Sequence, residues 1–73
     1  MFRVEKQVND EQGPHRWSRV GKPLPTRGDA EMAVREAARA SLEGPHPEGY
    51  RTTKFRVVHV LGAVAAIVCM VLQ

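Results

Sequence analysis

The side chains that most often carry chemistry in proteins are few in this chain and lie scattered along it. The three histidines, His15, His46 and His59, match none of the spacings that metal-binding motifs use. Cys69, the single cysteine, lies in an apolar run, where burial keeps a thiol protonated and inert. No hydroxyl or thiol sits in a nucleophile motif, and the glycines form no phosphate-binding loop. We therefore expect no enzymatic activity, no cofactor and no bound metal.

One cluster of side chains suits binding rather than catalysis. Arg16, Trp17 and Arg19 lie close together in the sequence, and Lys22 follows them. Arginine beside an exposed tryptophan is typical of the residues that dominate protein–protein interfaces. The same group can contact phosphates and stack a nucleic-acid base. Alternatively, Trp17 fills a small core with the arginines solvated at its rim, as the usual burial of tryptophan favours.

Length and composition agree with a small binding protein. The 73 residues are 42% hydrophobic and 26% charged, which is typical of a folded domain rather than a disordered chain. A chain of this length has room for a small core but not for a deep catalytic cleft. Eleven basic and eight acidic residues give a formal charge of +3, which favours an anionic partner without requiring one. The single cysteine excludes an internal disulfide, so a reducing cytoplasm is the simplest location.

A hairpin at the start of the chain must position this cluster. Residues 2–8 carry apolar side chains at alternate positions, with Lys6 as the one break, which predicts a half-buried strand. Turn-forming residues at 9–14 separate it from a predicted return strand over residues 15–20. Residues 21–25 include two prolines, which remove ladder donors, so we expect an extended connector there rather than a central strand.

A helix is predicted over residues 27–43. Thr26 can cap its first turn, with Asp29 reaching back in a variant of the capping box, and Gly44 followed by Pro45 ends it. Alanine dominates its apolar stripe and lets the helix lie close against a sheet. The stripe consists of Ala30, Ala33, Val34, Ala37, Ala38 and Leu42.

The predicted architecture is a single small α+β domain over residues 1–60. A third strand is expected within residues 50–60, where β-branched and aromatic residues are frequent. The order is then strand, strand, helix, strand, with one alanine-rich helix packed across a small antiparallel sheet. Residues 61–73 form a further apolar C-terminal segment, either packed on the domain or exposed.

The apolar end of the chain allows more than one interpretation. No charged residue occurs from Val57 to Leu72. The favoured interpretation is that the run begins as the third strand and then packs on the hairpin, supplying the bulky core residues that the helix lacks. As a helix, its sixteen residues span roughly 24 Å, short of the roughly 30 Å of membrane hydrocarbon. A tail anchor in the inner membrane, with Lys54 and Arg56 at its surface, therefore stays open, as does an exposed apolar tail.

Several segments together resemble one class of small proteins. These are Phe2-Arg3-Val4-Glu5, the return strand with Trp17, Pro23-Leu24-Pro25-Thr26-Arg27 before the helix, and Tyr50-Arg51 at the start of the last strand. The chain resembles small bacteriophage-encoded transcription regulators of the Xanthomonas phage type. The resemblance implies binding to host RNA polymerase, inhibition of initiation by interference with sigma-factor engagement, and read-through of terminators. It also implies action in the host bacterial cytoplasm.

Candidate contact residues follow from the side chains themselves, not from the resemblance. One predicted surface is the basic-aromatic cluster of Arg16, Trp17, Arg19 and Lys22. The other is the first strand, with Arg3, Val4 and Lys6, taken as an edge strand that pairs with a partner segment. Two further functions stay open. These are a tail-anchored membrane protein and a basic nucleic-acid-binding module whose affinity falls steeply with salt.

Overall fold

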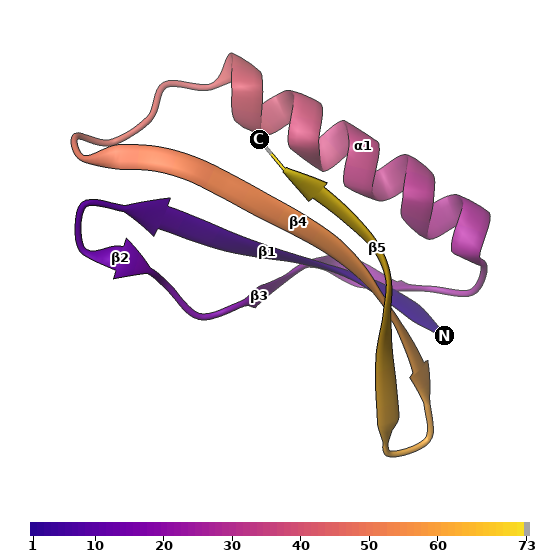
Figure 1. The fold of residues 1–73 in the computed structure, drawn as a ribbon. Coiled ribbons are helices and arrows are strands. Elements are labelled where there is room, and N and C mark those ends of the chain that lie inside the picture. Colours follow the sequence, from indigo (N-terminus) through magenta and orange to yellow (C-terminus); the bar gives the residue numbers. More distant parts are fainter. Residues whose placement is uncertain (73) are drawn as a thin grey trace.

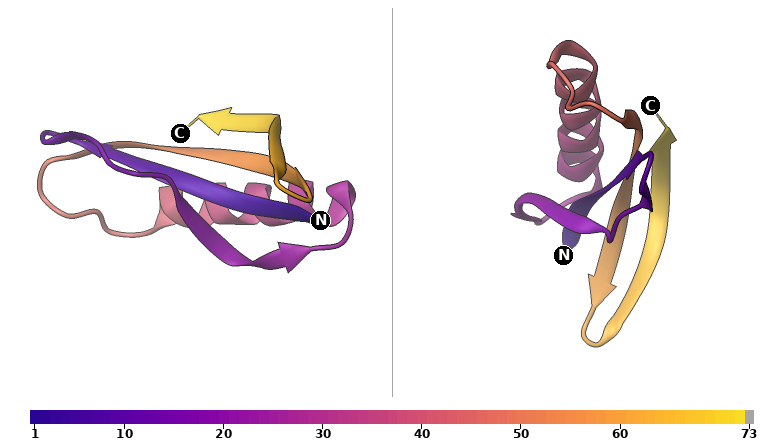
Figure 2. Two further views of the ribbon diagram at one scale, coloured as in Figure 1. Left: turned by 90° about the horizontal axis from the view of Figure 1, so that it is seen from below. Right: turned by 90° about the vertical axis from the view of Figure 1, so that its left-hand side faces the viewer.

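The computed structural model describes residues 1–72, and their side chains as far as Val68. Over these residues it contains one helix, α1 (Arg27–Glu43), and five strands. The strands are β1 (Phe2–Asp10), β2 (Gly13–Pro14), β3 (Ser18–Leu24), β4 (Tyr50–Leu61) and β5 (Val64–Leu72). They form one antiparallel sheet, and α1 lies across one of its faces (Figures 1 and 2). The α+β fold, with one helix packed on a small antiparallel sheet, is confirmed. The sheet has two strands beyond the three that the sequence predicts, the short β2 and β5.

Strand β1 lies at the centre of the sheet. It pairs with β4 along its whole length on one side, and with β3 and the short β2 on the other. The expectation that residues 2–8 form an edge strand is therefore wrong, because both sides of β1 are already hydrogen-bonded. The edge next to β4 is formed by β5 instead.

The strand register assigns each side chain of β1 to one of two faces. Val4 lies between Val20 of β3 and Val57 of β4, and the row that they form faces the helix. The next row places Glu5 between Arg19 and Arg56. Because successive side chains on a strand point to opposite faces, this charged row faces away from α1.

The core lies between α1 and the sheet and is built from small side chains. Its buried members are Val4, Ala30, Val34, Ala38, Phe55 and Val57. The helix contributes three of them at four-residue spacing, as its apolar stripe predicts. Leu42, the last residue of that stripe, is 70% exposed. Each four-residue step rotates by about 40° around a helix with 3.6 residues per turn, so Leu42 has turned away from the sheet.

Both ends of α1 lie where the sequence predicts, although only the Thr26 half of the predicted capping box is observed. The hydroxyl of Thr26 accepts a hydrogen bond of 3.1 Å from the backbone N–H of Asp29. At the other end, the N–H of Gly44 donates to the carbonyl of Ala40 at 3.2 Å, and the chain then leaves in an extended conformation. The bounds of the helix therefore match the predicted residues 27–43.

The proline-containing segment after Val20 is part of β3 rather than a separate connector. The strand continues as far as Leu24, which pairs with Phe2 beyond an irregularity in the register. Gly21 has a φ of 71°, a conformation that glycine adopts without strain. Pro23 is tolerated because β3 pairs only with β1, so its missing N–H removes no bond to a second strand.

The apolar end of the chain forms strands. Residues 57–61 complete β4, a tight turn follows at Gly62, and β5 returns beside β4. The helical alternative for residues 57–72 is therefore wrong. Within residues 1–72, no helix is long and apolar enough to cross a membrane.

Strand β5 belongs to the same sheet as the rest of the domain. Val68 packs against the core, whereas Leu61, Val64 and Ile67 are exposed by 62%, 66% and 53%. The turn between β4 and β5 projects away from α1 (Figure 1). The expectation of a buried Cys69 thiol lies outside the described side chains.

Candidate functional site

The sheet face opposite α1 carries the candidate site. Among residues 1–72, no helix or strand covers this face, which we call the open face (Figure 2). Its charged side chains come from three adjacent strands, as the register requires. They are Arg3 and Glu5 from β1, Arg19 from β3, and Lys54 and Arg56 from β4.

Glu5 holds two of the arginines of the open face in place. It is only 7% exposed, and its carboxylate accepts a hydrogen bond of 2.7 Å from Nε of Arg56. Nε of Arg3 lies 2.9 Å from the other carboxylate oxygen, an ion pair whose geometry does not make a hydrogen bond. A buried carboxylate contacting two guanidinium groups restricts both, so these cations are positioned before any partner binds.

Trp17 stacks on this network and does not fill the core. Cζ of Arg56 lies 3.9 Å from the centre of the Trp17 ring, a cation–π contact. The ring is partly exposed and is not a member of the core cluster. The alternative of a core tryptophan is therefore wrong. Trp17 lies in the irregular segment between β2 and β3, from which it reaches the open face.

The structure brings together part of the predicted contact set. Trp17, Arg19 and Arg3 share the open face, although the sequence assigned Arg3 to a different surface. Arg16 and Lys22 are exposed at either end of the segment that holds Trp17 and Arg19. Val4 is 1% exposed in the core, so it cannot contact a partner.

Sequence reasoning missed the residues of β4 that complete the open face. Arg56 stacks on Trp17, and Lys54 lies two residues away on the same face. Lys54 and Arg56 alternate with Phe55 and Val57 in the predicted strand, and this alternation could have indicated that both basic residues lie on one sheet face. The sequence does not reveal the register between β1 and β4, which brings Arg56 to Trp17 and Glu5.

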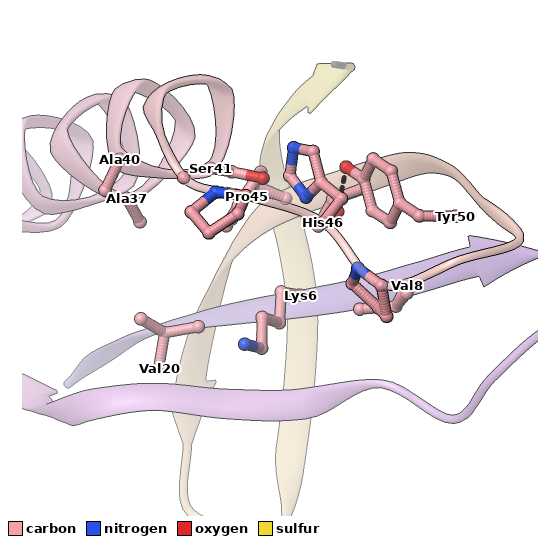
Figure 3. A pocket seen from close by; sticks show the side chains of 13 residues that line it. Lys6, Val8, Val20, Ala37, Ala40, Ser41, Pro45, His46 and Tyr50 are labelled. Atoms are coloured by element: carbon pink, nitrogen blue, oxygen red, sulfur yellow. Dashed lines mark hydrogen bonds between the residues drawn. The ribbon is translucent and has the colours of Figure 1, made fainter.

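A cavity lies on the helix-covered side of the sheet, beside the C-terminal end of α1 (Figure 3). Its volume is about 460 Å³, and most of its lining is apolar, including Val20, Ala37 and Phe55. Lys6 points toward it from β1, at the position where the apolar alternation of that strand is broken (Figure 3). The predicted contact residue Lys6 therefore lies on the opposite side of the sheet from Trp17.

The three histidines lie in three separate places. Nε2 of His15 is 2.8 Å from Oδ2 of Asp10, and this hydrogen bond, with a second from the backbone N–H of Gln12, lowers the pKa of Asp10. His46 stacks on Tyr50 and His59 on Phe2, with ring centres 3.8 and 4.3 Å apart. Across the part of the chain that the structure describes, no group of three metal-ligating side chains comes together.

Comparison of the chain with protein-family models, with curated proteins and with solved structures finds no match. The fold and the site define a small α+β domain with one sheet face packed on a helix and the other face basic, aromatic and open. The function is therefore inferred from the open face itself.

Proposed function

We propose that this protein is a non-enzymatic regulator that binds another protein through its open face. The observation that carries the proposal is the stack of Arg56 on Trp17, with Arg56 anchored by the buried Glu5. Tryptophan and arginine are enriched among the residues that supply most of the energy of protein interfaces. Anchoring them in advance lowers the entropy that binding would otherwise lose.

The charges of the open face favour an acidic partner surface. Arg3, Arg19, Lys54 and Arg56 are basic, and Glu5 is the acidic residue among them. Complementary potentials speed the encounter and select the correct partner. The partner is expected to offer carboxylates around an apolar depression that accepts the ring of Trp17.

Bacterial RNA polymerase is the first partner to test, because the chain resembles phage regulators that bind it. In this proposal the protein acts in the host cytoplasm and occupies the surface of a polymerase subunit. It inhibits initiation and promotes terminator read-through by changing which polymerase states are populated. Binding alone produces this effect, so no catalytic residue is needed.

Single-stranded nucleic acid is the second candidate partner. Four basic side chains beside a stacking ring are the elements of such a site. Two features favour the protein partner over it. The carboxylate of Glu5 lies among the cations, where it repels phosphates, and the described open face offers one aromatic ring rather than a row of them.

The test compares binding of the tagged chain to purified RNA polymerase and to a single-stranded oligonucleotide at low and high salt. We expect binding to polymerase with a modest salt dependence, and a loss of about tenfold or more in affinity for Trp17→Ala. Met32→Ala is the matched control, because Met32 is an exposed apolar residue on the helix, 61% exposed and far from the open face. Salt-sensitive binding to the oligonucleotide without binding to polymerase would replace the proposal with the second candidate.

A further inference from the structure

Strand β5 forms a sheet edge, and its first half, Val64 to Ile67, lies before the register shift at Val57/Val58 and lacks the usual protection against pairing. Natural edge strands are blunted by lysine, proline or short length. The opposite edge of this sheet has all three, since β2 has two residues and ends at Pro14, and β3 contains Lys22 and Pro23. β5 is nine residues long and contains neither a charged residue nor a proline. Its outer side is therefore suited to pairing with another uncharged strand.

The register of the β4–β5 hairpin shows which backbone groups point outward. Leu61 pairs with Val64 across the turn, and the closing pair of a two-residue hairpin exchanges both of its hydrogen bonds. Hydrogen-bonded and non-bonded pairs alternate from there, so Ala65 and Ile67 direct their N–H and C=O groups away from β4. Arg27 donates a hydrogen bond of 3.3 Å to the carbonyl of Val68. The open stretch of the described edge is thus Val64 to Ile67.

We propose that β5 pairs with β5 of a second copy of this chain, antiparallel, about a two-fold axis at Ala66. Ala65 of each copy then lies opposite Ile67 of the other. The outward N–H of each residue donates to the outward carbonyl of its counterpart, so the free groups satisfy one another. Ala66 meets its own equivalent on the axis, where its small side chain permits close approach.

Charge and side-chain size favour a second copy as the occupant. Residues 57–72 carry no formal charge, and Arg27, the cation beside Val68, is already paired with Glu31. The stretch Val64 to Ile67 therefore offers no charge of its own to an acidic or basic segment, whereas a second β5 is uncharged over the same residues. Ile67 is 53% exposed, and the pairing places it beside the small Ala65 of the other copy on the same sheet face. Because the interface is symmetric and the other sheet edge is protected, the association closes as a dimer.

The test is the mass of the full chain in solution, measured by sedimentation or light scattering over a range of concentrations. We expect a monomer–dimer equilibrium with a midpoint, the protein concentration at which half of the chains are dimeric. Ile67→Lys should raise this midpoint about tenfold or more, because it places an ammonium group in an apolar contact between strands. Met32→Lys is the matched control, with the same charge change at a similarly exposed apolar residue on α1, and keeps the wild-type midpoint. A wild-type monomer at all concentrations, or equal midpoints for the two variants, would overturn the proposal. So would a mass that grows beyond the dimer.

A second measurement uses the unmodified chain, so its result does not depend on whether a variant folds. Amide hydrogen exchange at Ala65 and Ile67 is expected to slow as the protein concentration rises through the dimer midpoint, while exchange at the outward amides of β3 stays constant. Concentration-independent exchange at both positions would exclude pairing at this edge. Trp17→Ala keeps the wild-type midpoint, since Trp17 lies on the open face and not at the β5 edge. The proposed dimer and the proposed partner binding are therefore tested independently of each other.

Discussion

Glu5 is the residue on which the arrangement of the open face most depends. Its carboxylate contacts the guanidinium groups of Arg3 and Arg56 while its own side chain is 10% exposed. Burying a carboxylate is costly unless cations and hydrogen-bond donors surround it. Arg56 also supports the ring of Trp17, so one buried acid indirectly positions the aromatic side chain.

Glu5→Gln tests this dependence. The amide loses the charge that attracts both guanidinium groups, and we expect the free energy of unfolding to fall by roughly 1–3 kcal/mol, reduced from the fully buried case because both arginines are partly solvated. Urea unfolding followed by Trp17 fluorescence measures this change, and the folded-state emission should also report a displaced ring. Glu36→Gln, at an exposed position on α1, is the control. Equal stability of the two variants would show that Glu5 does not hold the network.

At the scale of the elements, the contact of α1 with the sheet depends on few side chains. The helix buries Ala30, Val34 and Ala38, and of these Val34 contributes the most apolar surface. Alanines allow close approach but add little burial. The attachment of the helix therefore relies on Val34 and on the strand residues beneath it, Val4, Phe55 and Val57.

Val34→Ala is expected to destabilise the protein by about 1–3 kcal/mol, because two methyl groups are removed from a site that is 1% exposed and a small void remains. Leu42→Ala removes more carbon from the same helix at a position 70% exposed, and should change stability by less than about 0.5 kcal/mol. Chemical denaturation of both variants measures the difference. If Leu42→Ala proved the more damaging, the packed face of α1 would be assigned wrongly.

Local sequence was sufficient to predict some elements and not others. The helix could be predicted, since Thr26, the alanine stripe and Gly44 act within the helix or next to it. The central place of β1 could not, because it depends on β4, which is distant in the sequence. β5 was missed as a strand because an uninterrupted apolar run has no periodicity that separates strand from helix.

At the scale of the whole molecule, the candidate site could likewise be predicted only where its residues are close together in the sequence. Trp17 and Arg19 were found because they are neighbours in the sequence. Arg56 and Glu5 were not, although they make the hydrogen bond that organises the open face, since 51 positions separate them. Only the register of the folded sheet brings such residues together. The edge-strand assignment on which Val4 and Lys6 were chosen was wrong for the same reason, because the pairing of β1 with β4 depends on distant residues. Val4 is buried, whereas Lys6 is exposed beside the cavity and stays a candidate contact residue.

A whole-molecule prediction follows from the place of β4. A chain of residues 1–49 lacks Phe55 and Val57 and exposes Val4 and Val34, so it should remain unfolded even though it contains the hairpin and the helix. Circular dichroism and amide exchange check this. A protected hairpin or a cooperative melting transition in this fragment would contradict it.

The pairing of β1 with β4 also determines when the protein can fold during its synthesis. Ribosomes add roughly 5–20 residues per second, so the 51 positions between Glu5 and Arg56 take about 3–10 s to make. During that time the apolar side of the first strand has no lasting cover, and the buried acid has only one of its two cations. A sheet whose central pairing joins strands from opposite halves of the chain, β1 and β4, forms late and from distant parts, which places this small domain among the slower folders of its size.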